Sequence, residues 1–143
     1  MNYVKKFGLT QGPILKNLQE GKNISWKGKK ILASKATTLK KGKKVSFILD
    51  TLANENTIKV AKNADLLISE AAFLSTEHAD KALERGHLTA KQTATIAKKA
   101  NVKKLLITHI SQRYAKNETP ILHEVKKIFK NSELAKDFMS IVL

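Results

Sequence analysis

Short apolar runs alternate with amphipathic segments from residue 44 to the end of the chain. The apolar runs at 45–49, 66–68 and 105–107 are rich in strand-forming residues, and such uninterrupted runs are typical of strands buried on both faces of a sheet. Because strands that alternate with helices pair in parallel through right-handed crossovers, the pattern predicts an α/β fold. Helices are expected at 57–62, at 76–85, from 89 onward and at 120–130, with a last strand at 139–143.

Residues 1–43 show a less regular pattern. A short helix is expected through Ile14, Leu15 and Leu18, and Gly21 can end it. Two short runs at 24–26 and 30–32 flank a glycine, which predicts a small hairpin. No composition shift marks a domain boundary, so residues 1–143 are predicted to form a single domain, with 1–43 as an irregular, hairpin-containing lead-in and 44–143 as the β/α core.

Three of the predicted strands are followed by an ionisable residue: Asp50, Glu70 and His109. The carboxyl ends of parallel strands meet at one edge of a sheet, where α/β proteins bind their ligands. His87 lies at a junction between two predicted helices that can point back toward the same edge. These side chains are therefore candidates for a metal site with oxygen and nitrogen ligands, or for an acid–base set. The alternative is that each is simply a polar residue at the end of a strand.

Several chemistries are excluded by the sequence. It contains no cysteine, which removes disulfides, thiol nucleophiles and thiolate metal ligands. It also contains no glycine-rich phosphate loop, nucleophile-elbow motif or His-x-His pair. The other two histidines, His78 and His123, lie among polar neighbours in predicted helices and are expected to be solvated.

The charge of the chain is strongly one-sided. Lys and Arg number 27 against 12 Asp and Glu, giving a net charge of +15, and only Arg85 and Arg113 are arginines. Such a surplus favours a polyanionic partner, with nucleic acid as the first candidate; the alternative is a lysine-rich solvated surface. No apolar run approaches 18 residues and the amino terminus has no signal-peptide pattern, so a cytoplasmic location is expected.

Five segments together form a familiar pattern: Asp50-Thr51, Glu-Asn-Thr at 55–57, Ala-Asp-Leu-Leu-Ile-Ser-Glu-Ala-Ala-Phe at 64–73, Gly-His-Leu-Thr-Ala at 86–90 and Leu-Leu-Ile-Thr-His-Ile-Ser-Gln-Arg-Tyr at 105–114. Their order and spacing resemble ribonuclease Z, the zinc-dependent endonuclease family that trims the 3′ trailer from precursor tRNA. The resemblance extends over residues 8–143. It implies the C-terminal half of a metallo-β-lactamase αββα sandwich. The chain departs from the family where Ser-Glu-Ala-Ala replaces the usual His-Glu-Ala-Thr.

The resemblance also implies roles for the candidate residues. Asp50 matches the aspartate that bridges two zinc ions, and His109 matches a histidine of the second zinc site. Glu70 and His87 match a pair implicated in the proton transfers of cleavage. Lys16, beside an asparagine that replaces the family's usual lysine, and Arg113 are candidates for contacts with RNA phosphates.

The family's principal zinc motif, His-x-His-x-Asp-His, does not occur in this sequence. The resemblance therefore implies two zinc ions in the assembled enzyme but an incomplete site in this chain, which is expected to be inactive alone. The expected partners are precursor tRNA and either a second polypeptide carrying the missing motif or another copy of the chain. The alternative is a non-catalytic, basic RNA-binding or interaction protein derived from the same fold.

Overall fold

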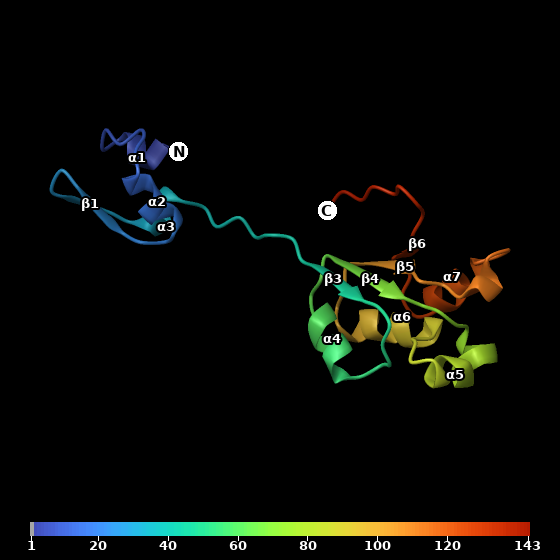
Figure 1. Cartoon of the computed structure of the whole chain (residues 1–143). Helices are drawn as coiled ribbons and strands as arrows, with labels where there is room; N and C mark the ends of the chain where they lie inside the picture. Colours follow the sequence, from blue (N-terminus) through green and yellow to red (C-terminus); the bar gives the residue numbers. More distant parts are fainter. Residues whose placement is uncertain (1) are drawn as a thin grey trace. The chain divides into compact units, whose positions relative to one another are not determined.

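The computed structural model describes residues 2–143 and divides the chain into two compact units, the first up to Gly42 and the second from Lys43 to Leu143 (Figure 1). The sequence predicts one domain whose lead-in meets the core at residues 43–44, and the structure separates two units at almost the same place. The lysine-rich stretch at 40–44 has no large apolar side chain before Val45, so it contributes nothing to a shared core.

The first unit contains helices α1 (Asn2–Lys5), α2 (Ile14–Gln19) and α3 (Ala33–Ala36) and an antiparallel hairpin of β1 (Ile24–Trp26) and β2 (Lys29–Ile31). The hairpin prediction is confirmed. Its two-residue loop, Lys27-Gly28, has φ values of 48° and 72°, as a tight turn that matches the twist of a hairpin requires. Leu9, Leu18 and Ile31 are buried in the small core of this unit.

The second unit is built on a four-stranded parallel sheet in the order β3-β4-β5-β6, so the predicted α/β fold is confirmed. Residue pairs such as Phe47 with Ile68 and Ile68 with Leu106 set the register between neighbouring strands. The strands are β3 (Val45–Ile48), β4 (Leu66–Glu70), β5 (Lys104–Thr108) and β6 (Ser132–Leu134). The helices are α4 (Glu55–Ala61), α5 (Ser75–Glu84), α6 (Ala90–Lys99) and α7 (Thr119–Lys126), with a 3-10 turn η1 (Gln112–Tyr114).

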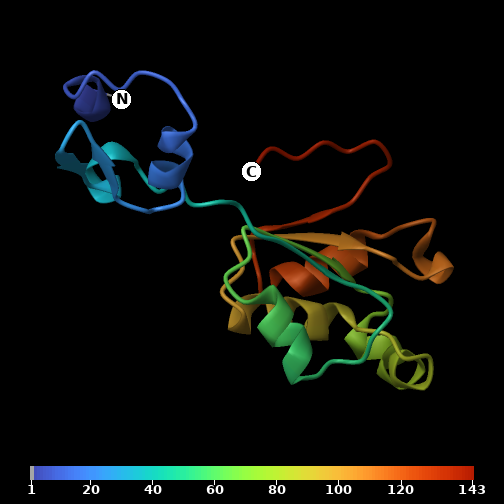
Figure 2. The same cartoon turned by 60° about the vertical axis from the view of Figure 1, so that its left-hand side comes forward.

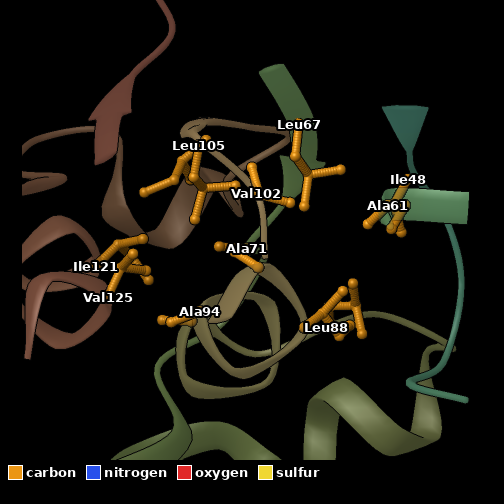
Figure 3. Packing of buried hydrophobic residues seen from close by; sticks show 14 of the residues in the cluster. Ile48, Ala61, Leu67, Ala71, Leu88, Ala94, Val102, Leu105, Ile121 and Val125 are labelled. Atoms are coloured by element: carbon orange, nitrogen blue, oxygen red, sulfur yellow. The ribbon is translucent and has the colours of Figure 1, made fainter. Parts of the chain in front are cut away.

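Helices pack on one face of this sheet, as Figures 1 and 2 show. Leu67 and Leu105 point from the strands toward Ala94 of α6 and Val125 of α7, and all four are fully buried (Figure 3). The alanines of α6 let the helix approach the sheet closely. The other face of the sheet, which we call the outer face, carries Val45, Phe47 and the residues paired with them, Leu66 and Ile68. Of these, Phe47 is 62% exposed.

The predicted last strand is wrong. Residues 139–143 adopt no regular structure, and the strand lies earlier, at β6. Backbone hydrogen bonding of 132–134 to the edge of β5 decides this assignment. The sequence Ser-Glu-Leu at 132–134 is poor in strand-forming residues, yet it forms the strand. The more apolar tail does not, and its residues Phe138 and Val142 remain almost fully exposed. Within the described residues, no helix is long and apolar enough to cross a membrane.

A capping box opens α6, where Thr89 is followed three residues later by Gln92. The Thr89 hydroxyl accepts a hydrogen bond from the Gln92 amide at 3.3 Å, and the Gln92 side chain accepts one from the Thr89 amide at 2.9 Å. Thr89→Ala is expected to lower the free energy of unfolding by about 1 kcal/mol. Urea unfolding would measure this, with Thr89→Ser as the control that retains the cap. Equal losses in both variants would contradict the capping role.

Candidate metal and acid–base site

The candidate residues lie where strands end. Asp50 follows β3, Glu70 is the last residue of β4, and His109 follows β5. Asp50 and His109 have φ values of 49° and 50°, in the left-handed region where Asp and His are enriched among non-glycine residues. The chain therefore turns sharply after β3 and β5, at the shared carboxyl edge of the sheet.

The structure brings Asp50, Glu70, His87 and His109 together. Each offers a ligand atom, and these atoms all lie within 4.8 Å of one another. His87 reaches the group from the segment between α5 and α6, and its ring centroid is 5.2 Å from that of His109. We call these four residues the strand-end cluster. A group of two carboxylates and two imidazoles can hold a divalent cation.

Within the cluster, Glu70 and His87 form a close hydrogen-bonded pair. Glu70 is fully buried, and its Oε2 atom lies 2.8 Å from His87 Nδ1. Its other carboxylate oxygen, Oε1, accepts a hydrogen bond from the Thr51 amide at 2.9 Å. Because an ionised carboxylate only accepts hydrogen bonds, His87 donates its Nδ1 proton to Glu70. This fixes the orientation of the ring and leaves Nε2 as the nitrogen available for other chemistry.

Asp50 and His109 form a looser and more exposed pair. Asp50 Oδ1 lies 3.4 Å from His109 Nδ1, and the two side chains are 70% and 48% exposed. Two ligands at 2.0–2.2 Å from one tetrahedral cation are about 3.3–3.6 Å apart. The Asp50–His109 separation therefore fits a shared cation, as do the 3.6 Å separations of Asp50 Oδ1 from His87 Nδ1 and of Glu70 Oε2 from His109 Nδ1. The 2.8 Å between Glu70 and His87 is instead a hydrogen-bond distance.

The two RNA-contact candidates lie on different units. Arg113, in η1, has its guanidinium carbon 5.4 Å from the centre of the Phe73 ring. That ring lies in turn 6.2 Å from the ring of His87, so the Phe73 ring contacts Arg113 and neighbours one residue of the strand-end cluster. Lys16 is an exposed residue of α2 in the first unit.

The expectation that His78 is solvated is wrong, whereas His123 is exposed as expected. His78 Nδ1 lies 2.8 Å from the hydroxyl of Tyr114, which itself accepts a hydrogen bond from the Leu74 amide. The partner lies 36 positions along the chain, and no local pattern around His78 identifies it.

Comparison of the fold places the second unit's architecture in a known class. A metallo-β-lactamase fold protein from Bacillus subtilis matches with a TM-score of 0.57 and 29% sequence identity, over 64% of this chain and 36% of that protein. The mixed α/β arrangement is therefore that of part of a metallo-β-lactamase fold. No protein-family model matches the chain.

Comparison of the sequence is more specific. The chain is 44% identical over 138 residues to ribonuclease Z of Archaeoglobus fulgidus and 42% identical over 133 residues to ribonuclease BN of Proteus mirabilis. These matches cover 96% and 91% of the chain but only 45% and 43% of the relatives. The chain is thus similar to ribonuclease Z along almost all of its own length, and it spans somewhat less than half the length of these curated relatives.

Proposed function

We propose that this chain is one half of a zinc-dependent endoribonuclease that removes the 3′ trailer from precursor tRNA. The convergence of Asp50, Glu70, His87 and His109 within 4.8 Å carries the proposal. An isolated polar strand end is common, but four groups suited to metal binding and proton transfer at one sheet edge are not expected from packing alone. Similarity to ribonuclease Z over 96% of the chain supports the same reaction.

Asp50 and His109 are the proposed zinc ligands. Two protein ligands are too few for a tight zinc site, which takes about four, or three with water. The remaining ligands are proposed to come from a half that carries His-x-His-x-Asp-His, either elsewhere in a longer protein or in a separate polypeptide. Zinc bound there would supply Lewis-acid stabilisation of the phosphodiester and an activated water.

His87 is the proposed proton donor to the leaving oxygen. Its Nδ1–H is held by the buried carboxylate of Glu70 at 2.8 Å, which fixes the ring and leaves Nε2 as the nitrogen free to transfer a proton. Donation of the Nε2 proton to the departing 3′ oxygen would leave a neutral alcohol on one product and a neutral imidazole on His87. Glu70 acts through His87, so its role is that of a positioning residue.

The substrate proposal rests on charge. A net charge of +15 suits a polyanion such as tRNA. Arg113, beside the Phe73 ring next to His87, is the proposed phosphate contact near the cluster, and Lys16 is a proposed contact from the first unit. The same charge also favours the second candidate function, that of a non-catalytic RNA-binding protein. This function does not require the strand-end cluster.

A chimera separates these two functions. In it, this chain replaces the matched 138 residues of the Archaeoglobus ribonuclease Z, so that one polypeptide supplies both halves. Zinc content and trailer cleavage are measured for the chain alone and for the chimera. We expect weak zinc binding and no cleavage by the chain alone, but two zinc ions and cleavage by the chimera. A chimera that folds and binds zinc but never cuts would favour the non-catalytic function.

The outer face of the sheet is proposed to be covered by the missing half. Phe47→Asp should therefore lower the free energy of unfolding of the chimera by about 2–4 kcal/mol, because it would bury an unpaired charge. In the chain alone, where Phe47 is 62% exposed, the change should stay within about 0.5 kcal/mol. Leu83→Asp, at an exposed position on α5, is the matched control. Equal small effects of Phe47→Asp in both proteins would contradict the proposed cover.

A further inference from the structure

The strands of the second unit begin at an edge of the sheet that is rich in lysine. All four strands are parallel, so they begin together at the edge opposite the strand-end cluster. Helices α4, α6 and α7 run back from the carboxyl edge and also end there. Four segments meet at this amino edge, at 43–44, 59–65, 98–104 and 126–133. Their eleven lysines are Lys43, Lys44, Lys59, Lys62, Lys98, Lys99, Lys103, Lys104, Lys126, Lys127 and Lys130.

Hydrogen bonds join these segments into one surface. The Lys44 ammonium donates to the Lys62 carbonyl at 2.7 Å, and the Asn63 amide donates to the Ala100 carbonyl at 2.7 Å. The side-chain amide of Asn131 donates to the Lys103 carbonyl. The lysines therefore lie on neighbouring segments of the same edge of the sheet.

Few carboxylates offset this charge. The four segments contain only Asp65 and Glu133, and both are already engaged, Asp65 with Lys103 at 2.8 Å and Glu133 with Lys104 at 3.1 Å. Hydrogen bonds from the Lys103 ammonium and the Lys44 amide lower the pKa of Asp65; burial raises it in part, and the charges of Lys103 and Lys43 lower it further. Lysines at this edge therefore outnumber its carboxylates eleven to two.

The opposite edge has the reverse balance. The loops that follow the strands and precede the helices there, at 49–56, 70–77, 86–92 and 108–118, contain three Lys or Arg residues against five Asp or Glu residues. Positive charge in the second unit is therefore segregated away from the cluster that suits a cation. Lysines at helix ends are stabilised by the helix dipole, but Lys43, Lys44 and Lys103 precede strands, where this stabilisation does not apply.

We propose that the amino edge of the sheet is a second RNA-binding surface, which contacts the phosphate backbone of a duplex away from the strand-end cluster. Lysines supply point charges that neutralise phosphates without reading sequence. The five residues of β4 separate the two edges by about 17 Å, so the amino edge is distinct from the strand-end cluster. This surface requires neither metal nor catalysis, so it goes beyond the proposed function.

A charge-matched pair of triple variants tests the proposal. The first replaces Lys62, Lys99 and Lys130 by Gln; all three are exposed at the amino edge and have no carboxylate within ion-pair distance among the described residues. The control replaces Lys81, Lys91 and Lys136 by Gln, which removes the same charge from the second unit outside this edge. Affinity for a fluorescent RNA duplex of about 20 base pairs is measured by anisotropy between about 50 and 200 mM KCl.

Loss of three phosphate contacts should reduce the slope of log affinity against log salt by about 2–3 and weaken binding at least about tenfold near 100 mM KCl. The control should change binding by less than about threefold. Equal losses in the two variants would show that net charge alone governs binding and would overturn the proposal, as would unchanged binding by the first variant. Urea midpoints equal to that of the unmodified chain would establish that both variants are folded.

Discussion

Replacing Asp50 by alanine in the chimera is expected to lower zinc content below two ions and to reduce trailer cleavage by more than about 100-fold. Asp50 is the proposed bridge between the two ions, and even residues that only support metal ligands cost 10–100-fold when removed. His109→Ala should behave in the same way, because its Nδ1 atom lies 3.4 Å from the Asp50 carboxylate. Metal analysis and single-turnover cleavage of a precursor tRNA measure the two effects.

Asp80→Ala is the matched control for this prediction. Asp80 is an exposed aspartate on α5 and lies outside the strand-end cluster, so its loss should leave zinc content and rate unchanged. Retention of two zinc ions by both the Asp50 and the His109 variants would contradict their assignment as ligands. Loss of zinc without loss of cleavage would contradict the metal-dependent reaction itself.

Replacing His87 by alanine in the chimera should lower the cleavage rate by about 10²–10⁴-fold while largely sparing zinc. This range is typical for removal of a general acid or base. Zinc should remain because the proposed ligands Asp50 and His109 are unchanged and the Nδ1–H of His87 is already engaged by Glu70 at 2.8 Å. The alkaline limb of the pH–rate profile, which reports the acid, should also disappear. His123→Ala, which removes an exposed histidine from α7, is the control.

Glu70→Gln provides a second measurement of the same pair. If Glu70 acts through His87, the double variant with His87→Ala should be no slower than His87→Ala alone. Additive losses would show that Glu70 has a separate role. A His87 variant that loses zinc in parallel with activity would instead make His87 a ligand.

Local sequence determined most of the elements. The runs before Asp50, Glu70 and His109 are apolar and rich in strand formers, and each forms a strand that the helices cover on one face. Parallel pairing then brings the three residues to one edge, so their convergence follows from chain order alone. The Thr89 capping box and the Lys27-Gly28 turn were also predictable, because each depends on contacts within a few residues.

Tertiary contacts decided the rest. Ser132–Leu134 is a strand because the edge of β5 is there to pair with it, while the more apolar tail at 139–143 has no such partner. His78 is held by Tyr114 from a distant turn. The sequence identifies Asp50, Glu70, His87 and His109 as candidate site residues, but it does not show which of them interact in pairs. Only the folded chain separates a buried, hydrogen-bonded pair from an exposed pair at ligand spacing, because burial and distances between side chains depend on the packing of segments that are remote in sequence.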